Sequence, residues 1–354
     1  MKTLHSASVI ALSVFVSVAY AQWTVTSLHP AGAFESHAFG ASVATQVGRA
    51  TIGGLQRARL WSGTAALWVD LNPAGATRSG AIGASGATQV GAAEVGGVWY
   101  AGLWSGTAAS WVDLNPAGVF ESRAFGVSGS SQVGIAVIGG VQRASLWSGT
   151  ATSWVDLNPT GASQSRAHGV SGSSQVGWAE IGGVQRASLW SGTAALWVDL
   201  NPAGASSSSS NGASGSEQVG WAEIGGVWFA SLWSGTATSW VNLNPAVASR
   251  SAAHGVLGAI QVGEVRVDGV NRASLWSGTA ASWVDLHPAG FSSSIATSIS
   301  TDGTTFFIAG WGVNISTGRS EALLWTQPVP EPATMAVLGF GLGLSALMRR
   351  KVKK

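Results

Sequence analysis

The stretch Ala144–Gly161 reads A-S-L-W-S-G-T-A-T-S-W-V-D-L-N-P-T-G and decides the fold. Its Leu-Trp pair returns every 43 residues, and so does the proline near its end. The tryptophans are Trp61, Trp104, Trp147, Trp190, Trp233 and Trp276, with a displaced seventh copy at Trp325. The prolines are Pro30, Pro73, Pro116, Pro159, Pro202, Pro245 and Pro288. A fixed period of this length indicates a solenoid or a propeller rather than an ordinary globular domain.

Each repeat offers four short apolar segments separated by turn residues. In one unit these segments are Ser122–Val127, Gln132–Ile138, Val141–Trp147 and Ser153–Leu157. The Gly139-Gly140 pair between the second and third segments has the sequence of a type I′ hairpin turn, and Asn158-Pro159 stops the fourth segment. No part of the repeats keeps the 3.6-residue period of a helix. Four antiparallel strands in about 43 residues are typical of a propeller blade.

The number of copies separates a closed ring from a linear solenoid. The first three strands occur seven times, but the seventh set is not followed by a fourth strand, because Trp325 runs directly into the C-terminal segment. The missing strand lies at the other end, where Trp23–Gly32 aligns Leu28 with Leu71 of the next repeat. A ring uses such a fragment to complete its last blade and to cover an exposed edge. We therefore predict an all-β, seven-bladed propeller over residues 22–328, with the first strand of each blade innermost.

Composition narrows the classes of function. The chain has no cysteine, which excludes disulfides and thiolate metal sites. Its basic character comes from the two ends, because residues 22–328 hold 12 arginines, no lysine and 15 acidic residues, a net charge of −3. Nucleic-acid binding needs clustered positive charge to neutralise phosphates. A slightly acidic body without such clusters excludes nucleic acid as a partner.

Residues 1–21 have the layout of a secretory signal peptide. Lys2 precedes an apolar run, Val9–Val18, and Ala19 and Ala21 are the small residues expected at positions −3 and −1 of a cleavage site. An uncleaved membrane anchor is the alternative, but the apolar run is short for a spanning helix. We expect a short helical signal that is cleaved after Ala21, and export of the chain.

Residues 329–354 contain three parts in order. The first is a V-P-E-P motif, the second is the uncharged run Ala333–Met348, and the third is a basic tail that begins at Arg349-Arg350. The residues of the motif are Val329, Pro330, Glu331 and Pro332. We expect the apolar run to enter a membrane, although it is slightly short for a relaxed span, and the basic tail to stay on the cytoplasmic side. A plain tail anchor with a chance P-E-P is the alternative.

This tripartite end closely resembles the PEP-CTERM sorting signal of Gram-negative bacteria. The resemblance implies processing near Pro330-Glu331-Pro332 by a membrane-embedded exosortase, with Arg349 and Arg350 as the basic stop of a transient inner-membrane anchor. It also implies association with the cell envelope and with exopolysaccharide. The repeats, with Q-V-G, a Gly-Gly turn, A-x-L-W and a W-V-D-L-N ending from about residue 33 to 326, resemble bacterial extracellular HAF-type repeats. That second resemblance implies fold and location more than activity.

Aromatic residues supply the candidate ligand contacts. We expect the regularly repeated tryptophans to form two rings that wedge between blades, since aromatics bury large areas. Trp99-Tyr100 and Trp228-Phe229 break the pattern, because they replace the Gln142-Arg143 pair of another repeat. They follow the Gly-Gly turn, where partial exposure would let them stack against a sugar ring. Local packing is the alternative.

Acids and histidines do not form a recognisable reactive site. One aspartate recurs in the fourth strand, where we expect it to cap a turn or to pair with Arg143 and its equivalents; the copies are Asp70, Asp113, Asp156, Asp199 and Asp285, with Asn242 once. Glu94, Glu180 and Glu223 share another position, and no unique pair of acids stands out for a glycosidase. The histidines lack metal-binding spacing. We expect no catalytic residue, no metal and no cofactor. The run Ser206–Ser210 predicts a solvated connection with a weakened first strand.

Together these features predict an exported, non-enzymatic propeller that binds or scaffolds material of the extracellular matrix, with exopolysaccharide as its partner. Its location would be the cell envelope, the outer surface or the extracellular space. One alternative is a carbohydrate-active enzyme, a lyase or glycosidase that uses the mouth of the propeller. Another is a structural surface protein without a specific ligand. The turns are short and nearly uniform. This favours a binding protein or a structural protein, because enzymes on this fold carry long unique loops around one face.

Overall fold

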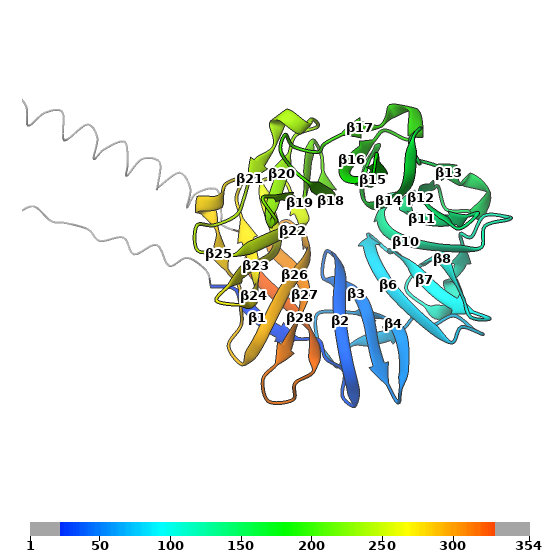
Figure 1. Ribbon diagram of the computed structural model, residues 1–354. Helices are drawn as coiled ribbons and strands as arrows, with labels where there is room; N and C mark the ends of the chain where they lie inside the picture. The colour runs from blue at the N-terminus through cyan, green and yellow to red at the C-terminus, as the bar shows by residue number, and fades with distance from the viewer. Residues whose placement is uncertain (1–21, 330–354) are drawn as a thin grey trace, which may run out of the picture.

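The computed structural model describes residues 22–329, and these residues form a seven-bladed β-propeller (Figure 1). Twenty-eight strands make seven four-stranded antiparallel sheets. The predicted fold class is therefore confirmed. The predicted signal peptide and, apart from Val329, the sorting and membrane segment lie outside the described residues. Within residues 22–329 no helix is long and apolar enough to cross a membrane.

The strands of each blade follow one another outward from the axis, as predicted. The innermost strands are β2 (Ala33–Ser42), β6 (Arg78–Ser85), β10 (Glu121–Ser128), β14 (Ala162–Ser171), β18 (Ser207–Ser214), β22 (Arg250–Leu257) and β26 (Phe291–Thr301). The second strands are β3 (Thr45–Ile52), β7 (Thr88–Val95), β11 (Ser131–Ile138), β15 (Ser174–Ile181), β19 (Glu217–Ile224), β23 (Ile260–Val267) and β27 (Thr305–Asn314). Blades 1 to 7 are numbered in the order of these innermost strands.

The outer half of each blade repeats the stretch on which the sequence is built. The third strands are β4 (Leu55–Trp61), β8 (Val98–Trp104), β12 (Val141–Trp147), β16 (Val184–Trp190), β20 (Val227–Trp233), β24 (Val270–Trp276) and β28 (Ser320–Pro328). The fourth strands are β5 (Trp68–Asp70), β9 (Val112–Asp113), β13 (Val155–Asp156), β17 (Val198–Asp199), β21 (Val241–Asn242), β25 (Val284–Asp285) and β1 (Thr24–Ser27).

The fourth strand is shorter than predicted. Ser153–Leu157 was expected to be one strand, but only Val155–Asp156 pairs with β12, and the residues before it form a short 3₁₀ helix. The Ser153 side chain braces this turn, since its Oγ accepts from the backbone N–H of Ser148 at 2.7 Å and donates to the carbonyl of Thr150 at 2.6 Å. Blade 4 forms the same turn with Leu196 at this position, so the hydroxyl is not required for it. The 3₁₀ helices are η1 (Ala108–Ser110), η2 (Ala151–Ser153), η3 (Ala194–Leu196), η4 (Ala237–Ser239) and η5 (Ala280–Ser282).

The Gly-Gly pairs form the predicted two-residue hairpin turns. Gly139 and Gly140 have φ angles of 57° and 79°, and Ile138 pairs directly with Val141 across them. Positive φ at both central residues is the requirement of a type I′ turn, and it is why glycine stands there.

The ring closes through the N-terminal strand. β1 pairs antiparallel with β28, and the backbone N–H of Leu28 donates to the carbonyl of Ala322 at 2.8 Å, as that of Leu71 donates to Ala58 in blade 1. The N–H of Ala322 in turn donates to Ser36 Oγ of blade 1 at 2.9 Å. The first and last blades therefore carry the same contacts as any other neighbouring pair.

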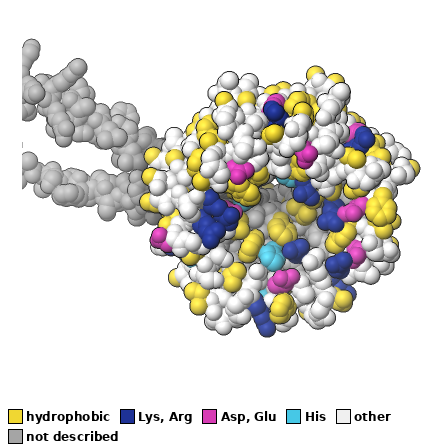
Figure 2. Space-filling view, viewed as in Figure 1, with side chains coloured by type: hydrophobic (Ala, Val, Ile, Leu, Met, Phe, Trp, Pro, Cys, Tyr) yellow, Lys and Arg dark blue, Asp and Glu magenta, His cyan; other side chains and the backbone are white. Residues whose placement is uncertain are grey.

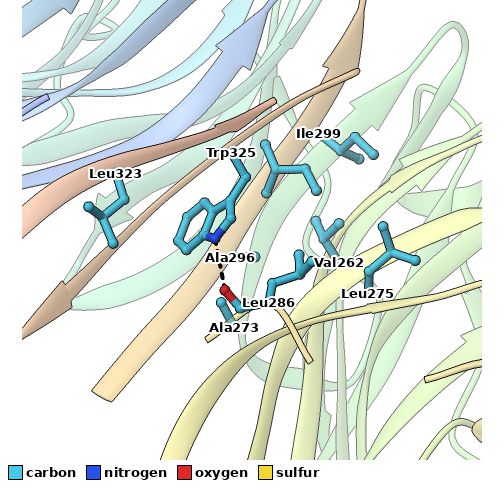
Figure 3. Close-up of a cluster of buried hydrophobic side chains, with 9 residues drawn as sticks. Val262, Ala273, Leu275, Leu286, Ala296, Ile299, Leu323 and Trp325 are labelled. Atoms are coloured by element: carbon cyan, nitrogen blue, oxygen red, sulfur yellow. Dashed lines mark hydrogen bonds between the residues drawn. The ribbon is translucent and has the colours of Figure 1, made fainter. Parts of the chain in front are cut away.

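The core consists of seven similar clusters between neighbouring blades. The tryptophan at the end of each third strand is fully buried there, as predicted for the first ring of tryptophans. Figure 3 shows the cluster between blades 6 and 7, where Trp325 packs with Val262 and Ala273 of blade 6 and Nε1 of Trp325 donates to the carbonyl of Leu286 at 2.9 Å. Burial of large indoles at every junction stabilises the ring as a whole.

The second ring of tryptophans is placed differently from the prediction. These side chains do not wedge fully between blades but cover the outer edge of the clusters, half-buried, and Trp68 is 38% exposed. Nε1 of Trp154 donates to Ser145 Oγ at 3.0 Å, and the same bond recurs in blades 4, 5 and 6. The short fourth strand explains the difference, because it leaves this side chain at the rim of the blade.

Candidate functional site

A cavity on the propeller axis is the first candidate site. Its volume is about 380 Å³, and residues of all seven innermost strands line it. Each of these strands has a β-bulge at the same position, which places one extra residue at the wall of the cavity. From blade 1 to blade 7 these residues are Phe39, Ile82, Phe125, His168, Asn211, His254 and Thr297.

A close approach of neighbouring backbones explains the glycine that follows the bulge. A Cβ atom on Gly126 would lie 2.8 Å from the carbonyl oxygen of His168 in the next blade, and Gly40, Gly83 and Gly169 have the same contact at 2.7–2.9 Å. In these four blades only a residue without a side chain fits this spacing, whereas blade 7 carries Ser298 at the same position. The innermost strands are thus held close together, and the bulge residues define the chemistry of the cavity wall.

The wall has an apolar side and a polar side. Blades 1 to 3 contribute Phe39, Ile82 and Phe125, whereas blades 4 to 7 contribute histidine, asparagine or threonine. Three of these polar side chains, those of His168, Asn211 and Thr297, bond to the backbone of the next blade. Nδ2 of Asn211 donates to the carbonyl of Ala253 at 2.9 Å, and Thr297 Oγ1 donates across the closure to the carbonyl of Ala38 at 3.1 Å.

The histidines of the wall are neutral at pH 7. Burial, followed by the positive charge of Arg166, lowers the pKa of His168 to about 4. Burial alone lowers the pKa of His254 to about 4. Nδ1 of His168 lies 3.2 Å from the carbonyl oxygen of Ser210, so this nitrogen carries the proton. The two rings therefore add hydrogen-bonding groups but no charge.

Arg166 is the one charged residue among those that line the cavity. Its guanidinium lies over the ring of Phe125 at 4.5 Å, and within the described part of the chain it makes neither an ion pair nor a hydrogen bond, and its buried Nε has no partner. Burial and the nearby charge of Arg123 lower the pKa of Arg166. In the space-filling view (Figure 2) arginine, acidic and histidine side chains surround the central hollow.

The neighbouring arginines are compensated by acids. Arg78 forms a two-bond ion pair with Glu94, at 2.6 and 2.8 Å, and Arg123 pairs with Glu121 at 2.8 Å. The bond from Arg78, followed by that from Thr77, lowers the pKa of Glu94 to about 2. Arg166 is thus the uncompensated member of a group of three arginines on blades 2 to 4.

The four predicted ligand-stacking residues lie in two separate blades. Trp228 is 41% exposed and is stacked on Trp221, with centroids 4.5 Å apart and 12° between the planes. Trp99 is half-buried and has the guanidinium groups of Arg78 and Arg123 near its ring, at 5.5 and 5.0 Å. Tyr100 and Phe229 are half-buried as well. The guanidinium of Arg250 lies over the Trp228 ring at 6.0 Å. The structure therefore gives a more exposed indole in blade 5 and a half-buried one in blade 2, each with arginine near its ring.

The repeated aspartates have both predicted structural roles. Oδ2 of Asp156 pairs with Arg143 at 2.7 Å, while its Oδ1 accepts from the backbone N–H of Asn158 at 2.8 Å and caps the turn. The same ion pair recurs at Asp70, Asp199 and Asp285. In blade 5, Asn242 keeps the turn bond at 2.7 Å. Aspartate therefore stabilises the outer turn.

Two histidines replace the turn asparagine without loss of its bonds. In His287, Nδ1 lies 2.7 Å from Ser294 Oγ and Nε2 lies 3.0 Å from the carbonyl oxygen of Phe291. The carbonyl can only accept, so Nε2 carries the proton and Nδ1 accepts from the serine. His29 makes the same pair of contacts. In other blades Asn158 and its equivalents use Oδ1 and Nδ2 for the same two partners.

The prediction for the serine run was wrong. Ser206–Ser210 was expected to be a solvated connection, but residues 207–214 form the regular strand β18, and Ser208, Ser209 and Ser210 are buried. Small hydroxyl side chains fit there because Ser208 Oγ accepts from the N–H of Ala187 at 2.8 Å and donates to Asn201 Oδ1 at 2.6 Å.

Sequence reasoning missed Arg166 and the bulge residues. The bulge residues had a signal in the sequence, because the position after the repeated alanine of the first strands (Ser210 in blade 5) varies from phenylalanine to histidine while its surroundings repeat. Nothing in the repeat says that this position faces the axis.

Among residues 22–329, no group of three or more histidines or acids lies close enough together to hold a metal ion. Burial raises the pKa of one acid, Glu264, whose carboxylate accepts from Asn271 at 2.9 Å.

The predicted residues of the two ends are outside the described part of the chain, namely Ala19, Ala21, Pro330, Glu331, Pro332, Arg349 and Arg350. Sequence comparison supports one of these segments, since residues 328–352 match the PEP-CTERM protein-sorting motif. The comparison with curated proteins gives no match.

Comparison with solved structures shows the fold alone. An oligogalacturonate lyase in complex with manganese is similar with a TM-score of 0.58 and 10% sequence identity, over 87% of this chain and 98% of that chain. TolB from Acinetobacter baumannii is similar with a TM-score of 0.47 and 12% identity, over 74% of this chain and 65% of that chain. The chain thus combines a seven-bladed propeller with a PEP-CTERM sorting motif, which implies export to the cell envelope or surface and processing by an exosortase.

Proposed function

We propose that this protein is a non-enzymatic carbohydrate-binding propeller, which an exosortase sorts to the cell envelope or releases outside, and which associates there with exopolysaccharide. The sorting motif at residues 328–352 supports the location. The resemblance of the repeats to bacterial extracellular HAF-type repeats supports the same location.

The exposed indole of Trp228 carries the binding part of the proposal. A tryptophan with 41% of its surface exposed is unusual at a position where blades 1, 3, 4 and 6 hold glutamine or asparagine, as at Gln142 and Gln185, and where only blade 2 holds another tryptophan, Trp99. Stacking on Trp221 holds the ring in one orientation. A rigid, flat apolar surface with a polar Nε1 suits the C–H face of a sugar ring.

The uniform turns favour binding over catalysis. In blades 1 to 6 the turn between the second and third strands always has two residues. No long loop covers a mouth of the ring in the described residues. A lyase or glycosidase on this fold is the second candidate, and the lyase among the similar structures shows that a related architecture can carry such an activity in another protein.

Two experiments test the proposal. Trp228→Gln restores the residue that three other blades carry, so it should keep the fold while weakening binding to a glycan array; Trp240→Gln, which removes a half-buried indole from the outer rim of the same blade, is the control. Binding that is equal in wild type and Trp228→Gln, or no binding to any glycan, contradicts the proposal. For sorting, truncation after Gln327 should abolish membrane retention of the precursor, and retention of the truncated chain would contradict it.

A further inference from the structure

The axial cavity contains an uncompensated positive charge that the proposed binding at Trp228 does not use. Arg166 lines the cavity and has no acid partner, although other arginines of its group are paired with glutamates. Burying part of a guanidinium without a counter-ion is unfavourable, so the structure leaves a position where an anion would be stabilised.

The orientation of Arg166 is set by its contact with Phe125. The guanidinium lies over the phenyl ring at 4.5 Å, and Phe125 itself meets His168 edge-on at 6.2 Å. A stacked guanidinium presents its face to the aromatic ring and leaves its N–H edge free. That edge has the fork geometry that binds a carboxylate with two parallel hydrogen bonds.

The charge and polarity of the cavity define the kind of anion. The two histidines are neutral at pH 7, so the wall offers a single positive charge, which matches a monoanion. The phenyl rings of Phe39 and Phe125 supply an apolar side, while His168, Asn211 and His254 supply polar groups opposite. A volume of about 380 Å³ is within the usual range of small-ligand pockets.

We infer that the axial cavity binds the carboxylate of a uronic acid residue, with Arg166 as its bidentate partner. The inference rests on the proposed carbohydrate binding and names its class, namely acidic glycans. The apolar C–H face of the sugar packs toward Phe125, and its hydroxyl groups reach the polar side of the wall. No bond is made or broken in this step, and Arg166 is a binding residue.

The test compares an oligogalacturonate with its methyl ester, which keeps the sugar but removes the charge. Isothermal titration of the full exported chain should show that the acid binds and that the ester binds about tenfold or more weakly, as expected for loss of a charge-assisted hydrogen bond. Arg166→Ser installs the residue that blade 5 carries at Ser209 and should weaken binding of the acid to the level of the ester. Arg166→Lys should restore part of the affinity.

The control is Arg186→Gln in the same blade. Arg186 pairs with Asp199 at 2.8 Å on the outer side, so its loss changes net charge by the same amount and should leave binding of the acid unchanged. A thermal melt establishes that each variant is folded. Equal binding of acid and ester, with no effect of Arg166→Ser, overturns the inference and leaves neutral glycan binding intact. Absence of binding to both probes and to the glycan array defeats the proposed function and this inference together.

Discussion

Acid should destabilise the propeller through the neutral histidines of the axial wall. The unfolded chain binds a proton on each histidine near pH 6.5, whereas folded His168 and His254 do so only near pH 4. Between these values the unfolded state holds more protons. The free energy of unfolding therefore decreases as the pH falls from 6.5 toward 4, and it stays at the lower level below that.

The size of the effect follows from the two pKa values. For a change from pH 7.5 to pH 5, linkage gives a loss of about 2 kcal/mol for each histidine, or about 4 kcal/mol for the pair. One kcal/mol corresponds to roughly 2 °C in melting temperature for a chain of this size. The histidine pair should therefore contribute a fall of about 8 °C.

Replacement of both histidines by asparagine isolates this contribution. The double variant His168→Asn/His254→Asn installs the residue that blade 5 carries, since Nδ2 of Asn211 already donates to the neighbouring carbonyl of Ala253 at 2.9 Å. Thermal melts of the two proteins at pH 7.5 and pH 5, followed by circular dichroism, measure the difference. His37, whose pKa burial lowers to about 4, and the acids are present in both proteins and cancel. An equal fall in wild type and variant would refute the assignment of neutral histidines to the wall.

Three further predictions concern the ring, and chemical denaturation measures each. Gly134→Ala should cost about 3 kcal/mol or more, because its Cβ would overlap the carbonyl oxygen of Arg123, whereas Gly80→Ala, with no atom within 4 Å, should be neutral or slightly stabilising; equal costs would contradict the contact. Leu28→Ala should cost about 2–5 kcal/mol, as much as Leu71→Ala, and a negligible cost would show that the N-terminal strand does not close the ring. Asp156→Asn should cost less than about 1 kcal/mol, since its ion pair is partly exposed and Asn242 keeps the same turn; a larger loss would contradict that.

Local patterns sufficed for most of the fold. Strand order within a blade was predicted from local features such as the Gly139-Gly140 turn and Trp147. The number of blades was predicted from the period of 43 residues. The count of half-blades predicted closure, which the pairing of β1 with β28 confirms. The fourth strand and the outer tryptophans were only partly predicted, because the 3₁₀ turn before this strand forms with either serine or leucine at its last residue, as at Ser153 and Leu196, so residue type alone does not indicate it.

The sequence by itself determined which residues repeat, where the chain turns and which segment completes the last blade, because these depend on neighbours along the chain. Only the tertiary structure decided which of the varying positions meet on the axis. Phe125, Arg166 and His168 belong to different blades or to different columns of the repeat, and they come together because the backbones of adjacent innermost strands approach closely enough to demand glycine. The absence of an acid beside Arg166 also depends on how neighbouring blades pack. The repeat in the sequence does not show it, because the repeat makes the seven blades look equivalent.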